Sequence, residues 1–183
     1  MRMVRRAFTI IEVIVIVAIM VILAAVITPN LVGVLDRQRI SGAVETMNGI
    51  ISALDSFNKD VGKVAGFLTQ LVEPITLSDS DACGVTYDQK RVDAWKGPYF
   101  ARNIASFGVP MGIGTVGNQV IRDNVVTKRM ILQIPQVTEE DAIAFNAQVD
   151  GDGSSTGGTV RWTTPDATGL VTVTYLTAHG TKC

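Results

Sequence analysis

The chain has 183 residues, and its 16 Lys and Arg against 17 Asp and Glu give a formal net charge of −1 at pH 7. This length allows one domain beyond a long N-terminal helix. Basic residues do not cluster beyond the first few positions and Lys128–Arg129, so the sequence offers no electrostatic footprint for nucleic acid. With a single histidine and no paired carboxylates, it offers no catalytic constellation either, and we expect a protein that is not an enzyme.

The N-terminal segment is apolar over twenty residues. Residues 8–27 read FTIIEVIVIVAIMVILAAVI and contain one charged residue, Glu12, while three arginines precede the segment. Twenty residues at a rise of about 1.5 Å cover roughly the 30 Å hydrocarbon core of a bilayer. An ionised carboxylate in such a segment costs about 2.5–3.5 kcal/mol, so we expect Glu12 to have a specific partner.

Three interpretations of this segment compete: a cleaved signal peptide, a plain membrane anchor and a prepilin-type segment. The apolar core is longer than the roughly 7–15 residues of a signal peptide, and it carries an acid. A plain anchor explains the length but not Glu12. Residues 6–13, RAFTIIEV, resemble the cleavage and methylation signature of type IV pilins and type II secretion pseudopilins. Pro29 also falls at the spacing from Phe8 at which that family commonly has a proline.

This resemblance implies specific processing and assembly. A prepilin peptidase would cut between Ala7, where the family usually has glycine, and Phe8, and would then N-methylate the new Phe8 amine. The short basic leader fits the positive-inside rule, which predicts a cytoplasmic N-terminus and a single pass through the bacterial inner membrane. In the assembled filament, Glu12 would pair with the Phe8 ammonium of a neighbouring subunit and set the axial register, because either charge alone is costly in a low-dielectric core.

The apolar pattern continues beyond Pro29 with helical spacing. Apolar residues recur largely at i, i+3, i+4 and i+7, which is typical of an amphipathic helix with one buried face. The stripe comprises Leu31, Val34, Leu35, Ile40, Val44, Met47, Ile50, Ile51, Leu54, Phe57 and Val61. Joined to the apolar segment, it predicts one helix of about fifty residues, with a kink, local melting or a continuous bend near Pro29.

The remaining residues predict an α+β head. Gly66–Glu73 reads as a short helix or turn ended by Pro74, residues 125–134 as a strand ended by Pro135, and Glu139–Gln148 as a helix capped by Thr138. Val160–Thr164 and Leu170–Leu176 predict a closing hairpin. We therefore expect a pilin-like α+β fold with an antiparallel sheet laid on the amphipathic helix. The predicted parts are a basic leader at 1–7, a membrane-spanning filament-core helix at 8–30, an amphipathic helix at 31–61 and an extracytoplasmic head at 62–183.

Two further features of the head bear on its chemistry. Cys83 and Cys183 both fall outside the membrane, where an oxidising compartment favours a disulfide over two free thiols. The loop with Asp150, Asp152 and Ser154 places oxygen ligands at alternating positions, as calcium loops do, although a solvated turn explains it better.

Two other patterns have structural explanations. Residues 112–117 match the dinucleotide fingerprint GxGxxG, but they lack its strand–helix context and predict turn glycines. Trp95 and Trp162 are expected to pack beneath the sheet.

The segments LTQLVEP and WKGPY resemble the middle of the major type II secretion pseudopilin, although the run that normally follows them is replaced at 106–117. We therefore expect a structural subunit of a type II secretion pseudopilus or a type IV pilus, periplasmic or on the cell surface. Its partners would be copies of itself and other pilin-like subunits, a prepilin peptidase, the inner-membrane assembly platform and membrane lipid before assembly. No cofactor is predicted apart from the calcium considered above. The alternative is a minor competence-type pilin that binds DNA or another ligand through its head.

Overall fold

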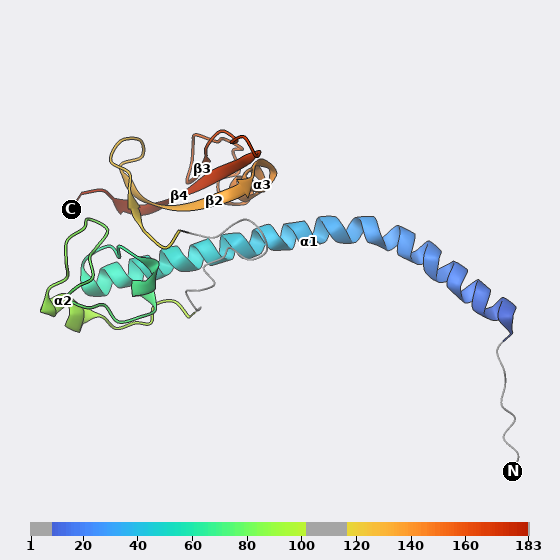
Figure 1. Cartoon of the computed structure of the whole chain (residues 1–183), viewed down its shortest axis with the longest axis horizontal. Coiled ribbons are helices and arrows are strands. Elements are labelled where there is room, and N and C mark those ends of the chain that lie inside the picture. The colour runs from blue at the N-terminus through green and yellow to red at the C-terminus, as the bar shows by residue number, and fades with distance from the viewer. Residues whose placement is uncertain (1–8, 102–116, 183) are drawn as a thin grey trace, which may run out of the picture. The chain divides into compact units, whose positions relative to one another are not determined.

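The computed structural model describes residues 9–101 and 117–182, with the side chains of 26–36 left outside the description. The chain divides into two compact units, Met1–Gln38 and Arg39–Cys183. Its elements in order are α1 (Ile10–Val61), the 3₁₀ helix η1 (Leu68–Leu71), α2 (Gln89–Ala94), β1 (Ile121–Arg122), β2 (Arg129–Thr138), α3 (Glu139–Val149), β3 (Val160–Trp162) and β4 (Leu170–Gly180) (Figure 1). The second unit begins inside α1 because the later turns of this helix supply part of its core.

Helix α1 has 52 residues, and its helical backbone runs through Pro29. Its part within the second unit buries one face. The buried apolar residues there recur mostly at three or four residues: Ile40, Ala43, Met47, Ile50, Ala53, Leu54, Phe57 and Val61. This spacing places them on one side of a helix, as the apolar pattern predicts. Leu31, Val34 and Leu35 of the predicted stripe lie outside the described side chains.

The predicted membrane span is contradicted. Within residues 9–101 and 117–182, no helix is both long enough and apolar enough to cross a bilayer. The membrane-spanning half of the predicted fold, the transmembrane assignment and the single pass through the inner membrane are corrected accordingly.

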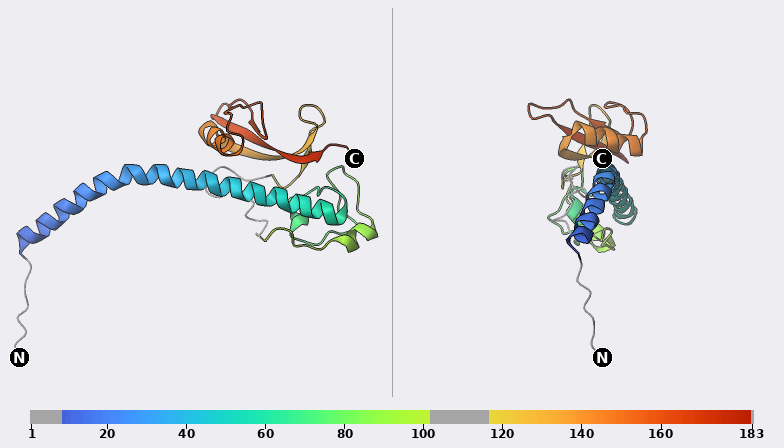
Figure 2. Two further views of the ribbon diagram at one scale, coloured as in Figure 1. Left: turned by 180° about the vertical axis from the view of Figure 1, so that it is seen from behind. Right: turned by 90° about the vertical axis from the view of Figure 1, so that its right-hand side faces the viewer.

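The head contains a four-stranded antiparallel sheet with the order β1–β2–β4–β3. The long strands β2 and β4 lie side by side at its centre, and α3 contacts β2, β3 and β4 (Figure 2). One continuous core joins α1 of the second unit to the sheet and α3, with Phe145 and Leu132 fully buried. The Tyr175 hydroxyl donates to Asn48 Oδ1 at 3.2 Å and so links β4 to α1. The predicted antiparallel α+β arrangement of the head is therefore observed.

Strand β2 differs from its predicted bounds at both ends. It begins at Arg129 and continues through Pro135 to Thr138, whereas Pro135 was expected to end it. The pairing with β4 shifts register between Ile134 and Val137, and Gln136 adopts a φ of 60°. Proline lacks the N–H that a regular ladder needs, but a bulge leaves that position unpaired, so the strand passes the proline without losing a bond.

Between the end of α1 and residue 101, the structure describes two short helices, η1 and α2. The short helix or turn predicted at Gly66–Glu73 is observed as the 3₁₀ turn η1. Thr138 caps α3 as predicted, because its Oγ1 accepts from the Asp141 amide at 3.2 Å. Trp162 is buried in the core, but Trp95 does not pack beneath the sheet. Its indole Nε1 donates to the Gln70 carbonyl at 2.9 Å, and its ring meets Tyr99 edge-on, so the WKGPY segment packs against η1.

Candidate assembly surface on the N-terminal helix

The first turns of α1 expose an apolar surface on every side. All described side chains from Thr9 to Ala25 are exposed, and among the large apolar ones Ile10 is 81% exposed and Ile11 72% exposed. We call residues 10–25 the apolar helix start. Large contiguous apolar surfaces on a folded chain mark sites of association. A helix that is apolar all round is normally buried, either in a protein core or in a membrane.

Glu12 is the one charged residue of the apolar helix start. Its backbone N–H donates to the Thr9 carbonyl at 3.1 Å and to Thr9 Oγ1 at 3.3 Å. Thr9 directly precedes the helix, and Glu12 follows it by three positions, which is the spacing of a capping box. A carboxylate in the first turn also interacts favourably with the positive end of the helix dipole. Sequence reasoning missed this local role, although T-x-x-E before an apolar run was its signal.

The predicted processing site cannot be placed. Ala7 and Phe8 lie outside the described residues, and so does the side chain of Pro29. The Glu12–Phe8 pairing between neighbouring subunits therefore stays a prediction.

The predicted disulfide also falls partly outside the described residues. Cys83 is not a free thiol, but Cys183 is not among the residues described. The Cys83–Cys183 pairing therefore stays a prediction.

The candidate calcium loop connects α3 to β3 and is held together by its own hydrogen bonds. Asp150 Oδ2 accepts from the amides of Thr159 at 2.8 Å and Val160 at 2.7 Å. Asp152 Oδ1 accepts from the Ser154 amide at 3.0 Å, and Ser154 Oγ accepts from the Gly157 amide at 2.9 Å. These oxygens satisfy backbone donors of a turn, which is the second interpretation considered from the sequence.

The loop also depends on a residue that the sequence did not single out. Asn146 is fully buried; its Oδ1 accepts from the Gly153 amide at 2.9 Å, and its Nδ2 donates to the Val160 carbonyl at 3.1 Å. Burial, together with the nearby Asp150 charge, raises the pKa of Tyr175.

Across residues 9–101 and 117–182, no three His, Cys, Asp or Glu side chains gather as metal ligands would. The calcium site stays a prediction.

Two remaining sequence features can be located only in part. Of the GxGxxG match, residues 112–116 lie outside the description, while the Gly117 amide donates to the Gln133 carbonyl at 2.7 Å. His179 lies near the end of β4, with Nε2 at 3.1 Å from Asp55 Oδ1.

Comparison with known proteins adds no relative. No family model, no curated protein and no solved structure matches this chain.

Proposed function

We propose that this chain is a non-enzymatic structural subunit of a helical filament of the type IV pilin and type II secretion pseudopilin kind. The proposal rests on one observation: the apolar helix start is exposed over its whole circumference in the single chain. Side-by-side packing of this segment with the same segment of other copies buries it. A helical array of copies repeats one contact along the filament, which is how a head-to-tail interface that does not close into a ring grows.

The sequence pattern favours this class over a generic aggregating segment. Glu12 falls at the fifth position of the proposed mature chain, counted from Phe8. Helix α1 continues from the apolar helix start to Val61. In the proposed filament, prepilin peptidase removes residues 1–7, and the Phe8 ammonium of one subunit pairs with Glu12 of the next. An unpaired charge within packed apolar helices is costly, so only the register that joins the two charges is stable.

The experiment that tests the proposal is filament formation by Glu12→Ala. The chain with residues 1–7 is produced together with a prepilin peptidase and a filament assembly system, and filaments are counted by electron microscopy. We expect the variant to reduce filament yield by about a hundredfold or more, because removing one partner of a buried ion pair costs about 3–5 kcal/mol. Glu45→Ala is the matched control, since Glu45 is an exposed acid on the same helix.

Two results would contradict the proposal. One is a normal filament yield from Glu12→Ala. The other is a mature chain that mass spectrometry shows to begin at a residue other than Phe8, because the charge pair requires the amine of that residue.

A further inference from the structure

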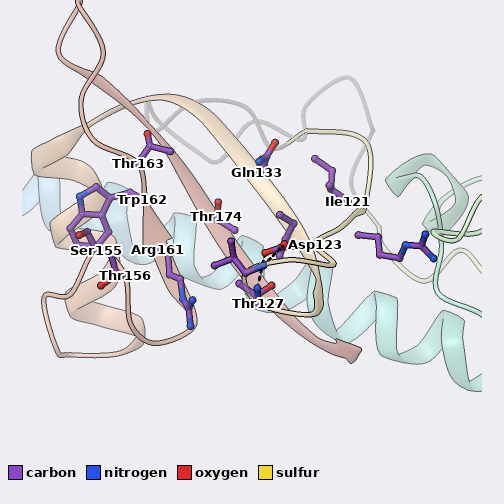
Figure 3. Close-up of a pocket in the computed structure, with 13 residues that line it drawn as sticks. Ile121, Asp123, Thr127, Gln133, Ser155, Thr156, Arg161, Trp162, Thr163 and Thr174 are labelled. Atoms are coloured by element: carbon purple, nitrogen blue, oxygen red, sulfur yellow. Dashed lines mark hydrogen bonds between the residues drawn. The ribbon is translucent and has the colours of Figure 1, made fainter. Parts of the chain in front are cut away.

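A groove of about 500 Å³ crosses the head on the sheet (Figure 3). We call it the sheet groove. It is lined by residues of the β1–β2 connection, of strands β2, β3 and β4, and of the loop before β3. In Figure 3, Asp123 and Thr127 lie across the groove from Trp162 and Ser155. Its volume is in the range of small-molecule binding sites, about 300–1,000 Å³.

Three polar side chains form a row on the floor of the sheet groove. Gln133 on β2 pairs with Thr174 on β4, and Thr174 pairs with Arg161 on β3. Residues directly opposite in neighbouring strands project from the same face of a sheet. The intervening Ile134 and Val173 are fully buried on the other face. An amide, a hydroxyl and a guanidinium are thus held in line by the backbone of the sheet.

Within the described part of the molecule, these polar side chains make almost no hydrogen bonds or ion pairs. In residues 9–101 and 117–182, no hydrogen bond involves the side chains of Gln133 or Thr174, and no carboxylate pairs with Arg161. Among the described residues, the Arg161 side chain makes one hydrogen bond, from Nε to the Gly158 carbonyl at 3.2 Å. This bond orients the guanidinium while leaving its two terminal NH₂ groups for a ligand.

The acid that lines the sheet groove does not neutralise Arg161. Asp123 accepts from the amides of Val125 and Val126 at 3.0 Å each and from the Thr127 amide at 2.9 Å. These backbone hydrogen bonds lower its pKa to about 2, so it stays ionised but directed at its own turn. The third charged lining residue, Arg122, is exposed on β1 and also basic. The groove therefore favours an anionic group on the Arg161 side.

The rest of the lining favours a polyhydroxy ligand. Hydroxyl groups of Ser155, Thr156 and Thr163 border the groove, and Ile121 and Ile131 add aliphatic patches. A sugar ring presents hydroxyls at its edge and C–H groups on its faces, and a uronic acid adds one carboxylate, which a guanidinium binds with two parallel hydrogen bonds. A nucleic acid strand would need several cations along its phosphates, whereas Arg161 and Arg122 are the cations here.

We propose that the sheet groove binds an acidic saccharide, with Arg161 holding the sugar carboxylate and with Gln133 and Thr174 hydrogen-bonding its ring hydroxyls. This binding does not depend on filament assembly, so the two proposals fail separately.

The test is isothermal titration of the full chain with trigalacturonate, in a non-ionic detergent that covers the apolar helix start. Fully methyl-esterified trigalacturonate is the ligand control, because it keeps the rings and removes the charge. We expect binding of the acid, with the ester weaker by about tenfold or more, as for loss of a charge-assisted hydrogen bond. Arg161→Gln should weaken binding of the acid by a similar factor. Arg91→Gln, which removes a partly exposed arginine paired with Asp88 away from the groove, should leave it unchanged.

Several results would overturn the inference. These are no binding of trigalacturonate up to millimolar concentrations, equal binding of acid and ester, or an Arg161→Gln variant that binds as well as the parent. Tighter binding of a single-stranded oligonucleotide than of the saccharide would also overturn it. Circular dichroism shows whether Arg161→Gln is folded, and Thr174→Val, which keeps the shape of the side chain but loses its hydroxyl, gives an independent second variant.

Discussion

Arg39 near the start of the second unit forms an ion pair with Asp141 in the first turn of α3. The Asp141 side chain is 9% exposed and that of Arg39 29% exposed, so the pair is largely withdrawn from water. It joins α1 to a helix that lies about a hundred residues later in the chain, next to the Thr138 cap. Electrostatics and capping thus act together where α3 begins.

Breaking this pair should destabilise the head. We expect Asp141→Ala to lower the free energy of unfolding by about 2 kcal/mol, because it removes a carboxylate that pairs with the Arg39 guanidinium in a partly buried place. Chemical denaturation of the full chain measures the change. Glu140→Ala removes an exposed acid from the same helical turn and should change stability by less than about 0.5 kcal/mol. Equal effects of the two variants would refute the role of the pair.

Two substitutions at the start of α1 distinguish the effect of the Glu12 charge from the role of Glu12 in capping the helix. Thr9→Ala should speed hydrogen exchange at the Glu12 amide by about fivefold, because loss of an N-cap costs about 1 kcal/mol. Glu12→Gln should leave this exchange nearly unchanged, since glutamine serves equally in a capping box. Only Glu12→Gln should prevent filament formation. If Glu12→Gln assembles normally while Thr9→Ala does not, the acid acts through the helix end and not through its charge.

The loop after α3 distinguishes a metal site from a turn. We expect Asp150→Ala to lower the free energy of unfolding by about 1–2 kcal/mol through loss of the bonds to Thr159 and Val160. The loss should be the same in a chelator and in excess calcium, as measured by thermal unfolding of the full chain. Calcium that raises the melting temperature of the parent but not of Asp150→Ala would instead establish a metal site. Asp166→Ala, in another exposed turn, serves as the control.

The three tyrosines should titrate abnormally at high pH. Burial is the main cause that raises the pKa of Tyr87, Tyr99 and Tyr175, and Tyr87 also donates to Gln70 Oε1 at 3.0 Å. Ultraviolet difference spectra should therefore show less than half tyrosinate at pH 10 in the folded chain, whereas the chain in guanidinium should be about half ionised.

The same shifts make stability depend on pH in a defined direction. Between pH 10 and the raised folded values, the unfolded chain binds fewer protons than the folded chain, so stability falls as pH rises. Below about pH 10 this contribution is fully present. Tyr87→Phe should remove part of the alkaline fall in stability. A folded chain whose tyrosines all ionise like those of the unfolded chain would contradict the burial of these side chains.

Local patterns determined much of this protein without its tertiary structure. The helical spacing from Ile40 to Val61 identified the buried face of α1, Thr138 identified the start of α3, and the runs around residues 165–169 identified the closing hairpin. Each of these depends on contacts between residues close in sequence, on side-chain periodicity or on turn chemistry, and these are written in the order of residues.

Tertiary structure alone decided the rest. Strand β2 continues past Pro135 because a bulge against β4 takes up the missing donor, and Trp95 packs on η1 because the Gln70 carbonyl lies within reach of its indole. The row of Gln133, Thr174 and Arg161 exists only through the pairing of three strands separated along the chain. Register between distant strands depends on how their faces fit a common core, and no single segment of the sequence contains that information.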